Sequence, residues 1–131
     1  MADLLLVDND ARILELMSLF LERAGHRVRT AGTFADARAR IRERRPDLML
    51  CDLEMGKESG REELPRIARE GELPPTLVVS GYADREVADV LKALPAISGV
   101  LRKPFDTARL LAVVQDCLEG LRPPAGGGPR A

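Results

Sequence analysis

The stretch LMLCDLEMGKESG, residues 48–60, decides the fold of this chain. It opens with an apolar run of strand length that ends abruptly at Asp52, and a polar loop containing glycine follows. Asp52 is therefore expected at the carboxyl end of a buried strand. In open α/β sheets, ligands bind in the crevice beyond these carboxyl ends, which makes Asp52 a candidate functional residue. Aspartate is also common in turns just after strands, and residue 52 alone does not separate the two interpretations.

On either side of this stretch, strand patterns and helix patterns alternate, which is typical of βαβ units around a parallel sheet covered on both faces. Apolar runs predict strands at residues 4–7, 28–31, 48–51, 76–79 and 100–101. Arginines alternate with apolar residues in the second run, which predicts an edge strand. The helical patterns predict a helix between Asp8–Asp10 and Gly25, one from Thr33 to before Pro46, one at 61–70, one carrying Val87, Val90, Leu91 and Leu94, and one at 106–121. In the first helix, apolar side chains at helical spacing are Ile13, Leu16, Met17, Phe20 and Ala24.

Length and composition predict one domain at residues 1–121, followed at 122–131 by a flexible tail or the start of a linker rich in proline and glycine. The chain has 20 Lys and Arg against 21 Asp and Glu, so neither nucleic acid nor a membrane surface is an expected direct partner. No signal peptide and no membrane-spanning apolar run are present, and Cys51 and Cys117 are spaced as buried thiols, so a cytoplasmic location is expected.

Polar side chains follow four of the predicted strands where each strand ends. Asp8 and Asn9 follow the first, Asp52 the third, Ser80 the fourth and Lys103 the fifth. In a doubly wound sheet of order 2-1-3-4-5 these ends lie at one rim, with the switch point between strands one and three. The sequence therefore predicts a shared polar pocket at this rim.

The chemistry of this pocket is suited to phosphoryl transfer. Mg²⁺ prefers a few carboxylates together with phosphate oxygens and water, and Asp8 and Asp52 supply carboxylates. The carboxylate of Asp52 can act as the nucleophile and form an aspartyl phosphate. Lys103 can neutralise a phosphoryl oxygen, and the Ser80 hydroxyl can hydrogen-bond another.

Four motifs carry a resemblance to a known family: VDND at 7–10, DLEM at 52–55 with Gly60 eight residues after Asp52, VVSGYAD at 78–84, and LRKPFD at 101–106. From Asp3 to about Leu121 the chain resembles the receiver domain of bacterial two-component response regulators. The resemblance implies a flavodoxin-like (βα)5 fold, a doubly wound parallel five-stranded sheet of order 2-1-3-4-5. It also implies a cis peptide between Lys103 and Pro104.

The resemblance further implies that a histidine kinase or phosphotransfer protein donates a phosphoryl group to Asp52, with Lys103 and Ser80 assisting. Mg²⁺ would be bound by Asp8, Asn9, Asp52 and the backbone carbonyl of Glu54. Ser80 would be the switch hydroxyl, and the face of the fourth helix, fifth strand and fifth helix would report to a downstream protein or output domain. Such a phosphoprotein is a signalling switch and not an enzyme, beyond its own phosphorylation and autodephosphorylation.

Three positions depart from the family pattern. Receivers usually carry two adjacent acids where this chain has Asp8 and Asn9, so weaker metal binding is expected. Gly56 replaces a frequent proline, which predicts a looser loop, and Val100 replaces a frequent aromatic switch residue. Glu54 and Tyr82 occupy variable positions that tune the phosphoryl lifetime.

Two further functions compete with the favoured one, a working receiver with weaker metal affinity. The first is a pseudo-receiver that acts as a phosphorylation-independent protein interaction module. The second, a nucleotide- or flavin-binding protein of the same fold class, is disfavoured because the first turn, VDNDA, has no glycine-rich phosphate cradle.

Overall fold

The structure, a computed structural model, describes residues 1–81 and 85–121, without the side chain of Val90. Outside the described residues lie Tyr82 with the rest of the end of the VVSGYAD motif, and the predicted tail at 122–131. The predicted position of the Val90 side chain on the apolar face of the fourth helix is likewise not described. The described elements are, in order, β1 (Asp3–Val7), α1 (Ala11–Arg23), β2 (Arg27–Ala31), α2 (Phe34–Glu43), β3 (Leu48–Asp52), β4 (Glu54–Met55), β5 (Glu58–Ser59), α3 (Gly60–Arg69), β6 (Thr76–Ser80), α4 (Arg85–Leu91), β7 (Ile97–Arg102) and α5 (Thr107–Leu121).

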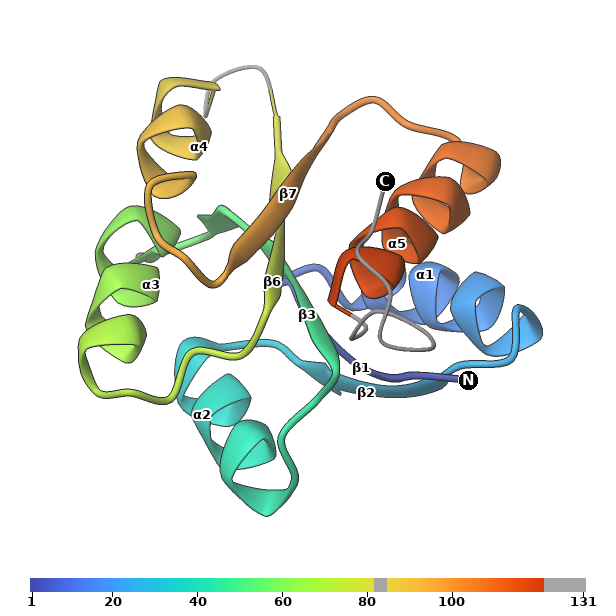
Figure 1. The fold of residues 1–131 in the computed structure, drawn as a ribbon, viewed down its shortest axis with the longest axis horizontal. Coiled ribbons are helices and arrows are strands. Elements are labelled where there is room, and N and C mark those ends of the chain that lie inside the picture. Colours follow the sequence, from blue (N-terminus) through green and yellow to red (C-terminus); the bar gives the residue numbers. More distant parts are fainter. Residues whose placement is uncertain (82–84, 122–131) are drawn as a thin grey trace, which may run out of the picture.

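Among the described residues, five strands form one parallel sheet of order β2-β1-β3-β6-β7. Because β6 and β7 are the fourth and fifth strands of this sheet, the predicted 2-1-3-4-5 order is confirmed, and β2 lies at an edge as predicted. Helices α1 and α5 cover one face, and α2, α3 and α4 cover the other (Figure 1). The structure therefore has the predicted doubly wound architecture.

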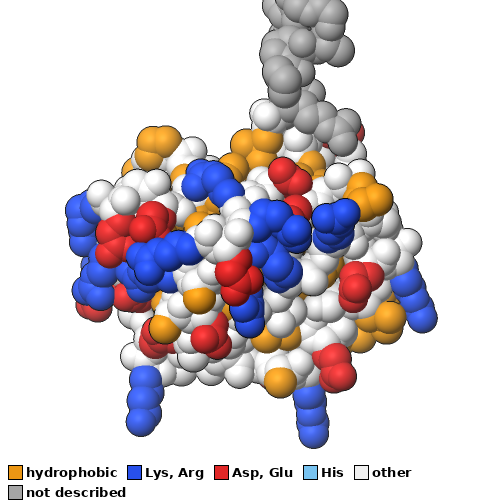
Figure 2. Space-filling model, turned by 90° about the horizontal axis from the view of Figure 1, so that it is seen from below, with side chains coloured by type: hydrophobic (Ala, Val, Ile, Leu, Met, Phe, Trp, Pro, Cys, Tyr) orange, Lys and Arg blue, Asp and Glu red, His pale blue; other side chains and the backbone are white. Residues whose placement is uncertain are grey.

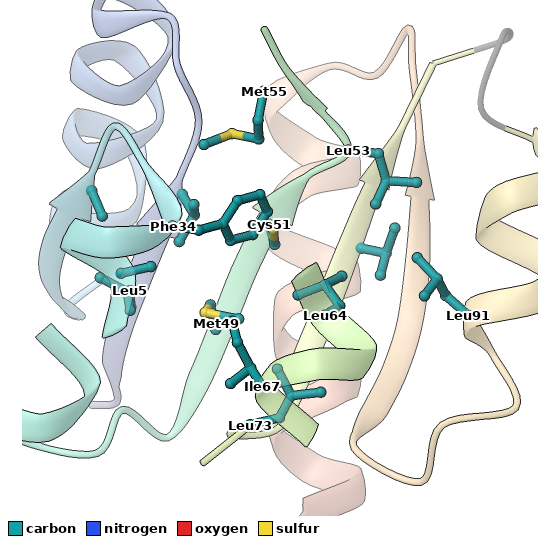
Figure 3. Close-up of a cluster of buried hydrophobic side chains, with 14 of the residues drawn as sticks. Leu5, Phe34, Met49, Cys51, Leu53, Met55, Leu64, Ile67, Leu73 and Leu91 are labelled. Atoms are coloured by element: carbon teal, nitrogen blue, oxygen red, sulfur yellow. The ribbon is translucent and has the colours of Figure 1, made fainter. Parts of the chain in front are cut away.

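The central strands are apolar on both faces because each face packs against helices. Leu5, Met49 and Cys51 point toward α2–α4, where they join a cluster that includes Phe34 and Ile67 (Figure 3). The alternate strand residues form a second cluster with α1 and α5, and its members from β1, β3 and β6 are Leu4, Leu6, Leu48, Leu50, Leu77 and Val79. The two-sided burial explains why these strands read as short continuous apolar runs.

The buried side of α1 matches the predicted apolar set only in part, since Met17 is buried and Ile13 packs against the core. Met17 and Leu21 are buried, whereas Leu16 is 54% exposed and Ala24 is also exposed. Leucines occur on several sides of this helix, so spacing alone did not identify the buried stripe. The helix is capped by Asp10, the last of the polar residues that precede it, whose side chain accepts hydrogen bonds from the N–H groups of Arg12 and Ile13.

Other differences from the predicted elements are local. β7 runs from Ile97 to Arg102 instead of covering only residues 100–101. Ser98 and Gly99 interrupt the apolar pattern, and Ser98 lies at a register irregularity, but pairing with β6 resumes at Gly99, opposite Leu77. The loop after Asp52 contains an antiparallel hairpin, β4–β5, which was not predicted. On α4, Ala88 and Leu91 are the described buried residues, and Leu94 follows the end of the helix.

The outer surface around α2 and α3 carries alternating charges. Arg38 pairs with Glu63 and Glu70, and Arg42 pairs with Glu72, so ion pairs join α2 to α3 and the turn after it. Figure 2, seen from below the view of Figure 1, shows basic and acidic side chains lying among one another on this side. Within the described residues, no helix is both long enough and apolar enough to cross a bilayer.

Candidate functional site

The carboxyl ends of β1, β3, β6 and β7 bring the predicted site residues to one edge of the sheet. The register pairs Val7 with Cys51, so the residues that follow, Asp8 and Asp52, are neighbours across the two central strands. Asp52 itself pairs with Val79, which places Ser80 one residue further along β6. A parallel sheet therefore assembles these side chains at one rim, as predicted from the strand ends.

Asp52 is the last residue of β3 and is only 3% exposed. Its Oδ1 accepts a hydrogen bond from the Glu54 N–H at 2.8 Å, and its Oδ2 lies 2.7 Å from the Lys103 Nζ. Both carboxylate oxygens are thus held in place. The side chain is fixed at the mouth of the sheet by a backbone donor on one side and an ammonium on the other.

Lys103 follows β7 and is joined to Pro104 by the predicted cis peptide. Its backbone N–H donates to the Ser80 carbonyl at 2.9 Å, which ties the ends of β6 and β7 together. Partial burial of the ammonium lowers the Lys103 pKa, but the hydrogen bond and charge of Asp52 outweigh this and raise the pKa overall. Lys103 is therefore a permanent cation in this site.

Asp8 lies just beyond β1 and is 5% exposed, and its Oδ1 accepts the Asp10 N–H at 2.8 Å. Burial of the carboxyl raises its pKa to about 6, the hydrogen bond and charge of Asp52 add to this, and the Asp10 N–H and Lys103 oppose it. At neutral pH, two buried carboxylates thus share a single lysine among the described residues that contact them. The site has an excess of negative charge that favours binding a cation.

The raised pKa of Asp8 predicts a stability change for Asp8→Asn in metal-free protein. The folded state binds more protons than the unfolded state between the unfolded pKa, about 4, and the folded pKa, about 6. Stability therefore falls as pH rises through this window, and the penalty is complete above it. The amide retains an acceptor for the Asp10 N–H and removes the charge. We expect Asp8→Asn to raise the free energy of unfolding by about 1–2 kcal/mol at pH 8, a value that is already reduced for solvent screening. Urea unfolding in EDTA measures it.

The matched control for this substitution is Asp116→Asn, on the exposed side of α5. Its expected effect stays within about 0.5 kcal/mol at every pH. The gain at Asp8 should shrink to about 0.4 kcal/mol near pH 4, where the carboxyl is protonated in the folded state and about half protonated in the unfolded state. An equal gain at pH 4 and pH 8 would contradict the electrostatic explanation.

Ser80 ends β6 and is fully buried. Its hydroxyl donates to the Gly81 carbonyl at 3.1 Å. The side chain is thus placed at the rim between β3 and β7, and its hydroxyl is engaged by the start of the following loop.

Asn9 is exposed, and its amide lies against the loop after β3. With the amide oriented to satisfy both of its polar ends, the nitrogen donates to the Glu54 carbonyl at 3.0 Å and the oxygen accepts the Gly56 N–H at 3.3 Å. The Glu54 side chain extends over Gly81, where a Cβ would lie 3.3 Å from its Oε1. The carbonyl named as a metal ligand is thus bonded to Asn9 in this structure.

The described residues contain no group of three or more His, Cys, Asp or Glu side chains placed to hold a metal. A divalent cation at this rim would depend on the two carboxylates of Asp8 and Asp52, with neutral oxygens from Asn9 and the Glu54 carbonyl. Mg²⁺ typically binds through one or two carboxylates, completed by phosphate and water, so this donor set fits it.

One anchoring contact of the loop was not predicted. The Glu58 carboxylate accepts the Phe34 N–H at 3.1 Å, which joins the hairpin to the first turn of α2. Acids at helix N-termini are favourable, but the two residues are far apart in sequence and no local pattern links them.

Both cysteines are free and buried as predicted, and burial raises the pKa of the Cys51 thiol, next to Asp52.

A comparison with models of known protein families shows which family has this fold and this site. The response regulator receiver domain model matches residues 4–115. The chain belongs to this family. The receiver domain of NtrX from Brucella abortus superposes with a TM-score of 0.80 at 30% identity, covering 89% of this chain and 98% of that one.

Curated relatives point to the same family. The nitrogen assimilation regulatory protein NtrX of Azorhizobium caulinodans is 34% identical over 122 residues, which are 92% of this receiver and 27% of the relative. The DNA-binding transcriptional regulator NtrC of Azospirillum brasilense is 31% identical over 126 residues, 95% of this chain and 26% of that protein. The chain thus spans about a quarter of the length of these relatives. It corresponds to the receiver part of a two-component signalling protein.

Proposed function

We propose that this receiver accepts a phosphoryl group on Asp52 in a Mg²⁺-dependent reaction and signals by a change of conformation. The observation that carries the proposal is the setting of Asp52. It is buried at a strand end, held by the Glu54 N–H and paired with Lys103 at 2.7 Å. Asp8 and Ser80 lie at the carboxyl ends of β1 and β6, the two strands on either side of β3.

In the proposed reaction, a carboxylate oxygen of Asp52 attacks the phosphorus of a phosphohistidine. An O–P bond forms, the P–N bond breaks, and the imidazole leaves with the electron pair. Lys103, already beside Asp52 Oδ2, would move to a phosphoryl oxygen and balance its charge. The Ser80 hydroxyl would exchange the Gly81 carbonyl for another phosphoryl oxygen, and this movement is the proposed switch.

Asp8, Asn9, Asp52 and the Glu54 carbonyl are the proposed ligands of Mg²⁺. Bound there, the ion supplies positive charge that neutralises the phosphoryl oxygens. The proposal is supported by the excess negative charge of Asp8 and Asp52. Asn9 brings an oxygen but no charge, so we expect weaker binding than at a site with two adjacent acids.

The phosphoryl donor is proposed to be a histidine kinase or a phosphotransfer protein, and the proposed location is the cytoplasm. We propose that the receiver domain spans residues 1–121 and that a tail or linker follows it.

The proposed output face, toward a downstream protein or an output domain, is α4–β7–α5. On it the Arg102 guanidinium lies 3.3 Å from Asp89, which links β7 to α4. Val100 stands on β7 where an aromatic relay is frequent in the family, so we propose no swinging ring here.

A second candidate is a pseudo-receiver that binds a partner without phosphorylation. The hydrogen bond from the Asn9 amide to the Glu54 carbonyl favours it, because that contact occupies a proposed metal ligand.

Acetyl phosphate treatment followed by intact-mass measurement tests the proposal. We expect one phosphoryl adduct on the wild-type chain with Mg²⁺ and none with EDTA. Asn9→Asp should reach the same occupancy at a lower Mg²⁺ concentration, because a second charged ligand strengthens the site. If neither chain is modified at any Mg²⁺ concentration, the phosphorylation proposal is wrong and the interaction module is the candidate that remains.

A further inference from the structure

We infer that Asn9 and Gly56 form a matched pair that clasps the loop after Asp52 in the absence of metal. The two residues lie on different loops, one after β1 and the other between β4 and β5. The Asn9 amide spans the gap, with its nitrogen 3.0 Å from the Glu54 carbonyl oxygen and its oxygen 3.3 Å from the Gly56 nitrogen. One side chain thus satisfies an acceptor and a donor of the loop backbone.

The orientation of this amide follows from its surroundings. The opposite orientation would set the amide oxygen against the Glu54 carbonyl oxygen and the amide NH₂ against the Gly56 N–H. Both contacts would then be repulsive, whereas the chosen orientation makes both attractive. An aspartate at this position has acceptors only and would repel the Glu54 carbonyl unless a cation lay between them.

Gly56 is suited to this clasp in three ways. It has the backbone N–H that the Asn9 oxygen requires, which proline lacks. Its φ of +69° lies in the left-handed region, which proline cannot adopt and other side chains rarely adopt. A Cβ at residue 56 would also lie only 3.0 Å from the Asn9 amide. The two departures from the family pattern, at residues 9 and 56, are therefore one structural device.

The clasp reverses an expectation drawn from the sequence, which was a looser loop because of Gly56. The Gly56 N–H is paired, and the neighbouring backbone is held by the Asp52–Glu54 hydrogen bond and the β4–β5 ladder. If the proposed function is correct, the Asn9 oxygen must leave the Gly56 N–H before it can bind the metal. Asn9 then has two roles: it orders the loop before metal arrives, and breaking the clasp opposes metal binding.

Amide hydrogen exchange of metal-free protein tests the clasp, because no phosphodonor is needed and failure of phosphorylation does not affect the readout. In EDTA, the Gly56 amide should exchange about fivefold faster in Asn9→Ala than in wild type, corresponding to the loss of one hydrogen bond. The Gly71 amide is the control. Its φ is also positive, and its N–H donates to the Ala68 carbonyl at 3.0 Å, away from Asn9. Equal Gly56 exchange in both proteins would overturn the clasp.

A double-mutant cycle tests the pairing separately. Gly56→Ala should lower the urea midpoint more in the wild-type background than in Asn9→Ala, because truncation of Asn9 removes the group that the new Cβ would meet. The strain from the positive φ is common to both backgrounds and cancels in the cycle. Equal losses in the two backgrounds would show that the residues are not a pair.

Discussion

Asp52→Asn is expected to remove the phosphoryl adduct completely under conditions that modify the wild-type chain. The neutral amide oxygen is a much weaker nucleophile than a carboxylate, so the O–P bond does not form. The substitution is nearly isosteric, and its oxygen can still accept the Glu54 N–H that holds the side chain at the end of β3. The expected loss is therefore chemical and does not require the site to unfold.

Intact mass after acetyl phosphate and Mg²⁺ measures this loss, and the far-ultraviolet circular dichroism spectrum checks that the fold is retained. The matched control is Asp47→Asn, which removes an exposed carboxylate bonded to the Asp3 N–H, at the opposite end of β3. The control should be modified as fully as the wild type. An adduct that survives Asp52→Asn would assign the phosphoryl group to another residue, with Asp8 the first to be tested.

The arrangement of the sheet could be predicted from the sequence because burial on both faces allows few residue types. Leu4–Val7 and Leu48–Cys51 are continuous apolar runs, and parallel strands of this kind must run in one direction and end at one rim. Once Asp52 was placed at the end of such a strand, Asp8, Ser80 and Lys103 followed by the same reasoning. The contact between Asp52 and Lys103, 51 residues apart, is a consequence of that topology.

The parts that could not be predicted depend on contacts without a periodic signature. The inner side of α1 was predicted only in part because Leu16 and Leu21 are equally apolar, and only packing against the sheet separates the exposed leucine from the buried one. The β4–β5 hairpin is two residues per strand, too short for an alternating pattern to be read. The Asn9 clasp joins a side chain to backbone groups, and backbone groups are the same in every sequence.

Leu77→Ala is expected to destabilise the fold by about 3 kcal/mol, a large part of the roughly 5–15 kcal/mol that stabilises a domain. Leu77 is 0% exposed in β6, between β3 and β7, and packs in the cluster covered by α1 and α5. Its neighbour on β7 is Gly99, which has no side chain to move into the space that truncation creates. The cavity should therefore stay open, and urea unfolding should show the full cost.

Leu16→Ala is the matched control, since the same atoms are removed from a side chain that is 54% exposed on α1. Its expected cost is within about 0.5 kcal/mol. Both variants should still accept a phosphoryl group at low denaturant, because the Asp52 carboxylate is held by Glu54 and Lys103, which neither substitution changes. A loss of stability can then be told apart from a loss of chemistry. A loss at Leu16 as large as the loss at Leu77 would contradict the assignment of α1's inner side to Met17 and Leu21, since only a buried leucine leaves a cavity on truncation.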